Sequence, residues 1–527
     1  MSNEPENKSE NAEVQNNHGG HDHGRMGMRG VTRPMEMHQH HSGGESEEDG
    51  HQMDDAHRRK MLTMHHEQTL WIYWTILLLG AWVMLSPLTF SYGKEVVAPS
   101  GERGVWLSDG LHTSLRVSLM TWSDLLSGAL LLIFGWRTLR PNRPISLWIC
   151  CFIGIWLSMA PVLFWAPSAA AYLNGTLIGA LLIALTILIP GMPNMIMYMQ
   201  MGPPTPPGWS YNPSSWPQRW IMIVTGFAGW LVSRYLAAFQ LGYIDHAWDP
   251  FFGESTKRVL NSSMSHTWPL SDGALGSLAY TFEFLMGYMG SPTRWRTMPW
   301  MVAFFGVLVI PLGLTHIFLV ISQPVVVHHW CTMCLLAAAI MLPMIPLEFD
   351  EVIAMGQHMI QAKRRGDHNG SLWRIFWMGG SADGCTADER SPQMVEFAER
   401  PWQVFKASIW GMSFPWTLLI SSGLGLWLMF SPAVFGIDIK SAAADVAHLG
   451  GALILTVSVV CMGEVVRSGR FLNVLLGLIV ALGPWLLSGE NASYSAASSV
   501  AGVIVMILAF PRGPKRESYG MWERYVR

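Results

Sequence analysis

Charged residues are scarce in this 527-residue chain. Asp, Glu, Lys and Arg together make up 13% of it, roughly half the share that is typical of soluble domains. Half of the residues are hydrophobic, and apolar runs recur at the length of about 20 residues that spans a bilayer. A large soluble protein is therefore excluded, and the chain is predicted to be a membrane protein with many spans.

Three further absences limit the classes of function that this chain can have. The first 60 residues contain no apolar core of the kind found in a cleavable signal peptide. No basic groove suited to nucleic acid is present, and the net charge is only -3. The six cysteines are too few and too scattered for a disulfide scaffold, and only Cys331 and Cys334 have the spacing of a redox or metal pair. We therefore expect no nucleic-acid partner, and we expect any thiol chemistry at this pair.

Twelve apolar segments are predicted to be membrane-spanning helices, so the expected fold class is all-α and polytopic. They cover residues 69–87, 115–136, 146–164, 169–190, 219–238, 271–290, 298–321, 327–346, 404–432, 441–466, 471–488 and 495–511. Arginine and lysine concentrate in connections of one parity, which predicts that this side and both termini are cytoplasmic. The expected location is a bacterial-type inner membrane.

Four of the predicted helices share a Gly-x-Trp step near their outer ends. They read LLLGAWVMLSPLTF from residue 77, CFIGIWLSMAPVLF from 151, SGLGLWLMFSPAVF from 422 and VALGPWLLSGENAS from 480. Each is followed by a second apolar segment with a small residue, such as Gly128 or Gly451, which lets two helices approach closely. The pattern resembles the SPW repeat, a two-helix membrane module, and it indicates helix packing more than chemistry.

Cys331 and Cys334 stand where polar and aromatic residues give way to an apolar run. A CxxC pair at a helix N-terminus suits redox work, because the sulfurs can meet and one of them is partly thiolate. A zinc clip is a second possibility, with His316, His328 and His329 as further ligands. Two small buried residues without chemistry are the third. The spacing alone favours the redox pair.

Residues 219–350 resemble the vitamin K epoxide reductase family, membrane four-helix bundles that pass electrons from protein thiols to a quinone. The resemblance rests on residues 243–287, which contain PLSDGALGSLAY, and on residues 294–338, which contain VVVHHWCTMCLLAA. It implies that Cys334 faces the quinone ring, and that Cys331 exchanges disulfides with an outward-facing thiol protein. It also implies that Asp272, with Ser271 beside it, hydrogen-bonds a quinone carbonyl.

Aromatic cover for the quinone, either ubiquinone or menaquinone, is expected from Trp330, Phe251 or Phe252. Typical family members carry a second cysteine pair in the first outward loop, whereas loop 239–270 has none. Either a soluble thiol protein attacks Cys331 directly, or the segment has lost turnover and keeps only a ligand-binding role. Both alternatives are compatible with the sequence.

The first 60 residues are polar, unpatterned and rich in His and Met, which predicts a disordered tail. Imidazole and thioether groups suit copper, and imidazole also suits zinc. The candidate ligands are His18, His21, His23, His38, His40 and His41. An alternative function follows from them, namely a non-enzymatic membrane protein that handles copper or zinc or acts as an assembly scaffold. A transporter is less favoured, because few charges lie inside the spans.

The predicted organisation has seven parts, and the sequence indicates no oligomeric state. The parts are a His/Met-rich tail at 1–66, an SPW-like repeat pair at 67–192, a Pro-rich linker at 193–218, a reductase-like four-helix core at 219–350, a cytoplasmic loop at 351–402, a second SPW-like pair at 403–511 and a basic tail at 512–527. Within the core, Arg234 is expected either to snorkel to the membrane interface or, in the favoured alternative, to pair with Asp245 or Asp249. Glu283 is expected either to handle protons or to join two helices.

Overall fold

The computed structural model of the protein describes residues 55–93, 113–188, 202–487 and 491–526. Within these ranges the chain is almost entirely helical, and the few β contacts are isolated bridges. In this described part of the chain, ten helices are long and apolar enough to cross a membrane, which confirms the all-α, multi-pass fold. The candidate metal ligands His18, His21, His23, His38, His40 and His41 lie outside the described residues.

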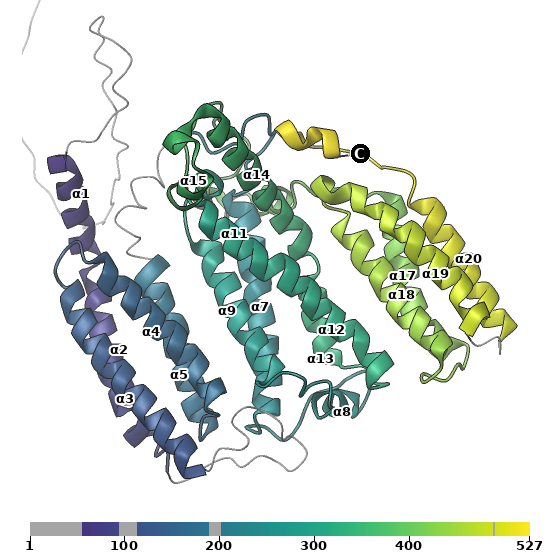
Figure 1. Cartoon of the computed structure of the whole chain (residues 1–527), viewed down its shortest axis with the longest axis horizontal. Coiled ribbons are helices and arrows are strands. Elements are labelled where there is room, and N and C mark those ends of the chain that lie inside the picture. Colours follow the sequence, from purple (N-terminus) through teal and green to yellow (C-terminus); the bar gives the residue numbers. More distant parts are fainter. Residues whose placement is uncertain (1–54, 94–112, 189–201, 488–490, 527) are drawn as a thin grey trace, which may run out of the picture. The chain divides into compact units, whose positions relative to one another are not determined.

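The N-terminal part consists of a helix and two helical hairpins (Figure 1). After α1 (Asp55–Gln68), the first hairpin pairs α2 (Leu70–Thr89) with α3 (Thr113–Thr138). The second pairs α4 (Pro144–Leu163) with α5 (Ala169–Ile183), which continues into the π-helical turn η1 (Ala184–Leu188). Helix α3 also packs against α4, so the two hairpins form one unit.

The C-terminal part repeats this plan with α17 to α20. Here α17 (Trp416–Val434) pairs with α18 (Ala442–Val460), and α19 (Leu472–Leu487) pairs with α20 (Ala492–Leu508). The 3-10 segment η5 (Glu464–Phe471) leads into α19. Helix α20 is apolar but has 17 residues, slightly fewer than the about 20 that span a bilayer.

All four hairpins close on a glycine–glycine crossing. A Cβ atom added to Gly451 would lie 2.6 Å from the carbonyl oxygen of Gly425, closer than real side chains come. Only glycine lets two backbones approach this closely. The same relation joins Gly80 with Gly128, Gly154 with Gly179, and Gly477 with Gly502. In the fourth hairpin the crossing glycine is therefore Gly477, whereas Gly483 of the Gly-x-Trp step packs against Val446 of α18.

The central core contains four helical passes between the hairpin units. They are α7 (Trp216–Gln240), α9 (Asp272–Tyr288), the broken helix formed by α11 (Pro299–Val307), η2 (Leu308–Leu312) and α12 (Gly313–Val326), and the pass formed by α13 (Thr332–Met341) and α14 (Met344–Arg365). Helix α7 packs mainly on α9 and α13. The π turn η2 contains Pro311, which cannot donate the helical hydrogen bond at that point.

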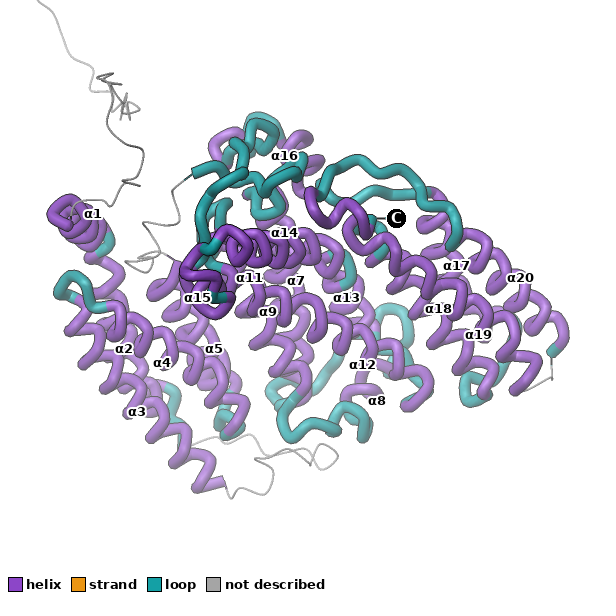
Figure 2. Tube along the Cα trace, turned by 45° about the horizontal axis from the view of Figure 1, so that its top comes forward, coloured by secondary structure: helices purple, strands orange, loops and turns teal. Residues whose placement is uncertain are grey.

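Short helices and loops cover the end of the core where α14 finishes. These helices are α10 (Arg294–Thr297), η3 (Asp367–Gly370), α15 (Leu372–Met378), η4 (Met394–Glu396), α16 (Pro401–Ser408) and η6 (Gly520–Tyr525). Figure 2 shows the connecting loops gathered around α15 and α16. Helix α14 continues to Arg365, so part of the expected 351–402 loop is an extension of the core. The span expected at 404–432 begins only at Trp416, because α16 forms a separate helix.

The segment expected as a linker and the C-terminal segment are packed against the core. The Tyr211 hydroxyl donates to Asp350 over 2.8 Å, and the Tyr519 hydroxyl donates to Glu464 over 2.9 Å. Both tyrosines are fully buried, and Trp209 forms an isolated bridge with Tyr519. These contacts make residues 202–215 and 515–526 part of the folded core.

Arg234 connects the core to the N-terminal hairpins. Its Nη1 atom donates to the hydroxyl of Thr176 on α5 over 2.8 Å, and its guanidinium lies 4.7 Å from the centre of the Trp230 ring. The expected pairing with Asp245 or Asp249 is therefore wrong. A hydroxyl on a neighbouring helix and the face of an aromatic ring thus contact the guanidinium in place of a carboxylate in the loop.

Candidate functional site

The CxxC pair lies at the start of α13. Cys331 is the N-cap residue, and its sulfur accepts a hydrogen bond from the backbone N–H of Cys334 over 3.1 Å. The two sulfurs form a disulfide, with 5.2 Å between the Cα atoms. A helix N-terminus favours negative charge, so this position stabilises a thiolate at Cys331 whenever the disulfide is opened.

The loop formed by residues 239–270 covers this turn. Asp249 accepts hydrogen bonds from the Thr332 hydroxyl over 2.5 Å and from the backbone N–H of Thr256 over 2.8 Å. The Thr256 hydroxyl in turn accepts from the backbone N–H of Thr332 over 3.1 Å. As a result Cys331 has no exposed surface, and Cys334 is only 7% exposed.

The hydrogen bonds to Asp249 stabilise its ionised form. Partial burial raises the pKa of Asp249, but hydrogen bonds from Thr332, Phe252 and Thr256 outweigh that effect, so its pKa lies below the ordinary value of 3.8. The carboxylate is thus ionised at physiological pH, when it accepts these bonds most strongly.

His329 makes a second contact between the turn and the loop. Its Nδ1 atom lies 3.4 Å from the Ser255 hydroxyl, and its Nε2 atom lies 3.3 Å from Nη1 of Arg258 on the short helix α8 (Ser255–Leu260). An arginine can only donate, so this contact requires a neutral Nε2. Burial, and then the positive charges of Arg258, His328 and Lys440, lower the pKa of His329 below 6.5.

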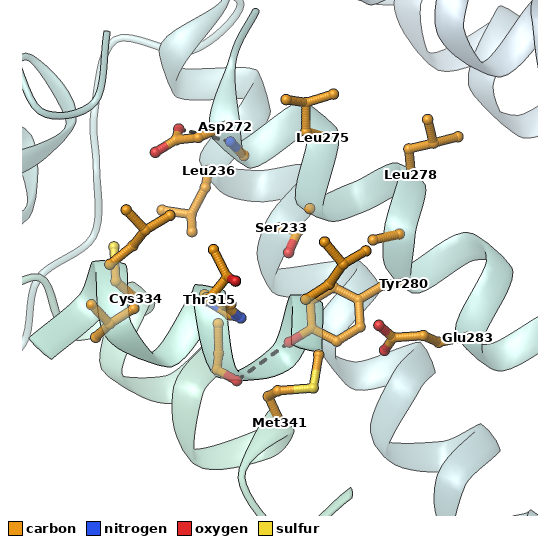
Figure 3. A pocket seen from close by; sticks show the side chains of 18 of the residues that line it. Ser233, Leu236, Asp272, Leu275, Leu278, Tyr280, Glu283, Thr315, Cys334 and Met341 are labelled. Carbon is orange, nitrogen blue, oxygen red and sulfur yellow. Dashed lines mark hydrogen bonds between the residues drawn. The ribbon is translucent and has the colours of Figure 1, made fainter. Parts of the chain in front are cut away.

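A cavity of about 470 Å³ opens beside Cys334, between α7, α9, α12 and α13. Figure 3 shows its lining, with Cys334 on one side and Glu283 on the other. Most of the lining is apolar, including Leu236, Leu275 and Leu278. Such a volume, with few polar groups on an apolar wall, suits a small flat ligand.

Asp272 lies at the mouth of this cavity, at the first residue of α9. Its carboxylate accepts a short hydrogen bond from the Gln240 side chain, which also reaches Ser265. Ser271 is the N-cap of α9: its hydroxyl accepts from the N–H of Ala274 over 3.2 Å and donates to Gln240 over 2.6 Å. Asp272 therefore faces the cavity, whereas Ser271 shapes the helix end behind it.

The other residues expected at the site lie elsewhere. Trp330 does not line the cavity, because its ring packs against Phe430 and His448 of the C-terminal hairpins. Phe251 is 79% exposed, and Phe252 packs against the apolar core. Within the described ranges no three His, Cys, Asp or Glu side chains come together to hold a metal, and Cys331 and Cys334 are joined to each other in a disulfide.

Four cavity residues carry functional groups that sequence reasoning missed or left open. Trp268 and Tyr280 supply aromatic rings, and Tyr280 also donates to the carbonyl of Ala337 over 3.4 Å. His316 and Glu283 line the wall as well. The helical spacing that puts Tyr280 one turn after Gly276 of PLSDGALGSLAY could have indicated its position, whereas Trp268 sits in a loop without a pattern.

Two family models match the chain. The model of the vitamin K epoxide reductase family matches residues 220–349, and the model of the SPW repeat domain matches residues 415–511. Both resemblances inferred from the sequence are thereby confirmed for these ranges. No curated protein and no solved structure matches the chain. The chain thus combines a vitamin K epoxide reductase-type domain, which contains the Cys331–Cys334 disulfide, with an SPW repeat domain in one multi-pass membrane protein.

Proposed function

We propose that this protein is a membrane thiol–disulfide oxidoreductase, in which Cys331 and Cys334 pass electrons from a protein thiol to a quinone. The observation that carries the proposal is the shared cavity: Cys334 and Asp272 line the same largely apolar space of about 470 Å³. A quinone head group is a flat ring with two carbonyl oxygens, so it needs one polar contact and apolar walls. Ubiquinone and menaquinone both meet this description.

The reductive half of the reaction balances in electrons and protons. The Cys331/Cys334 dithiol gives up two electrons and two protons and becomes the disulfide, while the quinone takes up two electrons and two protons and becomes the quinol. Cys334 is the sulfur that faces the ring, because it lines the cavity and Cys331 does not. Asp272 donates to one carbonyl oxygen of the quinone when its carboxyl group is protonated, and as a carboxylate it accepts from one hydroxyl of the quinol.

A thiol protein outside the membrane resets the pair. Its thiolate attacks the sulfur of Cys331, Cys334 leaves as a thiolate, and a second thiol of the partner resolves the mixed disulfide and releases Cys331 as a thiolate or thiol. The N-cap position of Cys331 assists this last step, because the helix N-terminus stabilises the leaving thiolate. Loop 239–270 contains no cysteine, so the partner acts on Cys331 directly.

The proposed location is the inner membrane of a bacterial-type cell, with the CxxC end outside and both termini in the cytoplasm. The basic residues in the connections of one parity support this orientation. The copper or zinc function predicted for residues 1–66 remains a separate hypothesis, since its histidine ligands lie outside the described residues.

The test is quinone reduction by the purified full-length protein in detergent, with a dithiol reductant and a short-chain ubiquinone or menaquinone. The unmodified protein should reduce quinone, Cys334→Ala should reduce none, and Cys331→Ala should lose reset by a dithiol. Cys385→Ala is the matched control, since Cys385 is a free cysteine away from the cavity. Turnover by Cys334→Ala at the unmodified rate, or no turnover by the unmodified protein, would overturn the proposal.

A further inference from the structure

Glu283 is a buried carboxylate without a partner. It lies on α9, is 1% exposed and lines the cavity on the side opposite Cys334 (Figure 3). Neither of its oxygens has a hydrogen-bond partner among the residues that the structure describes. Burying an unpaired carboxylate among apolar groups is costly, and ionisable residues inside a membrane protein are usually functional. In the described part of the chain, no hydrogen bond supports the helix-joining role expected as one alternative.

A second such carboxylate, Glu348, lies on α14. It is 2% exposed, and its Oε1 atom has no hydrogen-bond partner in the described part of the chain. Helices α9 and α14 both pack against the π turn η2 of the broken helix, so the two carboxylates lie on neighbours of the same turn. Glu348 interacts electrostatically with Glu283. It also interacts with the charges of Glu351, Asp350 and Arg294.

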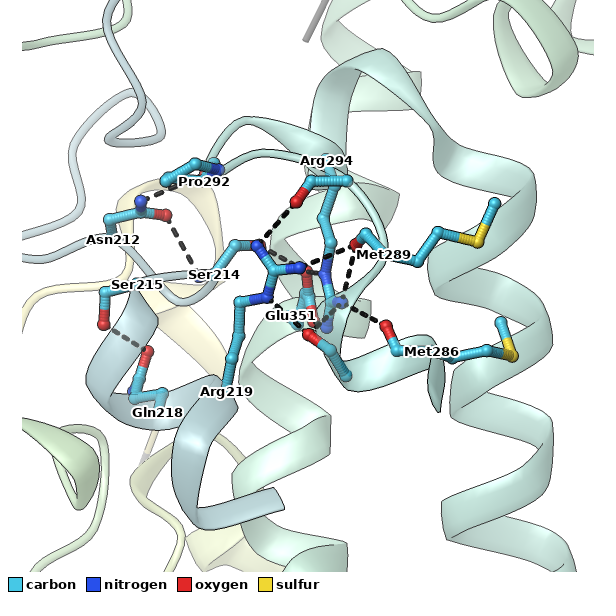
Figure 4. A network of polar contacts seen from close by, with 12 residues as sticks. Asn212, Ser214, Ser215, Gln218, Arg219, Met286, Met289, Pro292, Arg294 and Glu351 are labelled. Carbon is cyan, nitrogen blue, oxygen red and sulfur yellow. Dashed lines mark hydrogen bonds and ion pairs between the residues drawn. The ribbon is translucent and has the colours of Figure 1, made fainter. Parts of the chain in front are cut away.

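A third carboxylate of α14, Glu351, belongs to an ion pair at the end of the core. Arg294 donates two hydrogen bonds of 2.5 Å to Glu351, which also accepts from the Ser214 hydroxyl (Figure 4). Arg294 and Arg219 further bind the Met289 carbonyl just beyond the last turn of α9, over 3.2 and 2.7 Å.

This ion pair lies at the opposite end of α9 from the turn that contains Cys331 and Cys334. Asp272, the first residue of α9, stands at the cavity mouth, whereas Met289 follows its last residue. Glu283 and Glu348 therefore lie between the cavity and the Arg294–Glu351 end.

We infer that Glu283 and Glu348 form a proton route from the Arg294–Glu351 end of the core to the quinone cavity. The inference rests on the proposed function and adds the side from which the quinol receives its protons. The two thiol protons leave on the Cys331 side, and two protons enter from the other side through Glu348 and Glu283. For each quinone that is reduced, two positive charges therefore cross the membrane, while two electrons pass from Cys334 to the ring.

Other groups near this route have assigned contacts. Tyr280, on the same helix as Glu283, donates to Ala337, and Asp350 accepts from Tyr211. His316 on α12 lines the cavity and stacks edge-on with Tyr280. Glu283 is thus the carboxylate in the cavity wall next to the second unpaired carboxylate, and it is the group whose removal should interrupt the route.

The experiment uses the full-length protein in liposomes that hold a trapped pH-sensitive dye. An external membrane-impermeant phosphine reduces only those molecules whose CxxC end faces outward, and a short-chain quinone accepts the electrons. The unmodified protein should make the interior more alkaline by about two protons per quinone, and an uncoupler should abolish the signal. Glu283→Gln and Glu348→Gln should each lower the rate of quinone reduction at least tenfold, and Glu283→Asp should restore part of it.

The matched control is Asp124→Asn, a buried carboxylate on α3 that is bonded to Tyr92 and lies outside the core. It should keep the rate and the internal alkalinisation. Quinone reduction without an internal pH change, or an unchanged rate and pH profile in well-folded Glu283→Gln, would overturn the proton route and leave the oxidoreductase function intact. Absence of quinone reduction by the unmodified protein would instead overturn the function itself.

Discussion

The indole ring of Trp330 packs edge-on against the imidazole of His448, with 5.4 Å between the ring centroids. Trp330 directly precedes Cys331, and His448 lies on α18 within the SPW repeat domain. The contact joins the two matched domains next to the turn that contains Cys331 and Cys334. The C-terminal hairpins therefore support the position of the cysteines as well as the membrane fold.

Replacing Trp330 should test this support. Trp330→Ala removes a ring that is 8% exposed, and such a truncation costs about 3–5 kcal/mol of unfolding free energy. We expect a lower midpoint of thermal unfolding in detergent, together with faster reduction of the Cys331–Cys334 disulfide by a phosphine. Trp402→Ala, at a ring that is 64% exposed, should change neither, and equal effects of the two variants would contradict the supporting role.

Acidification should loosen the loop over the disulfide. The pKa of His329 is lowered in the folded protein, so the stabilising neutral form is fully present above about 6.5 and is lost as the pH falls through the lower folded value. Protonation also ends the hydrogen bond from Arg258 to Nε2. The rate of phosphine reduction of the disulfide should rise below pH 6.5, and this rise should disappear in His329→Gln. A rise of the same size in that variant would assign the effect to another group.

Asp272 should affect quinone binding more than the chemical step. Asp272→Ala removes one hydrogen bond to a ring oxygen, worth about 0.5–1.5 kcal/mol, so KM for quinone should rise about two- to tenfold. Asp272→Asn keeps a hydrogen-bonding group and should stay near the original value. Steady-state kinetics measure both, with Glu254→Gln in the outward loop as the control. A fall in kcat with an unchanged KM would remove Asp272 from the binding role.

The glycine crossing of the third hairpin should be intolerant of a single methyl group. In Gly451→Ala the new Cβ would lie 2.6 Å from the Gly425 carbonyl oxygen, and overpacking of this kind costs about 1–3 kcal/mol. Gly423→Ala, on the same hairpin, meets nothing within 4 Å and should gain helix propensity of about 0.5–1 kcal/mol. The two midpoints of thermal unfolding should therefore move in opposite directions, and a shift of both in one direction would refute this account of the crossing.

The sequence predicted the membrane passes well, because each apolar run has the length of a bilayer and little else can satisfy its backbone. The resemblance also placed Cys334 and Asp272 at one ligand, and in the structure both residues line the same cavity. Helix ends were harder: Cys331 turned out to be an N-cap residue, and Trp416 starts a helix expected from residue 404. These ends depend on tertiary contacts, such as the bonds from the Asp249 loop.

Pairings between distant segments could not be predicted from one sequence. Glu283 and Glu348 lie on two helices that pack against the same π turn, and no local pattern marks that arrangement. Trp330 turns toward His448 for a similar reason, since its partner lies more than a hundred residues away.

Cys331 is completely buried under the loop formed by residues 239–270, and this burial limits how fast a donor thiol can reduce it. A donor thiol cannot reach the sulfur until the contacts of Asp249 and His329 have opened, so opening must come before attack. At high donor concentration the reset rate then levels off at the rate of loop opening. That plateau should be the same for every donor, large or small, and donors should differ only in the concentration at which they reach it.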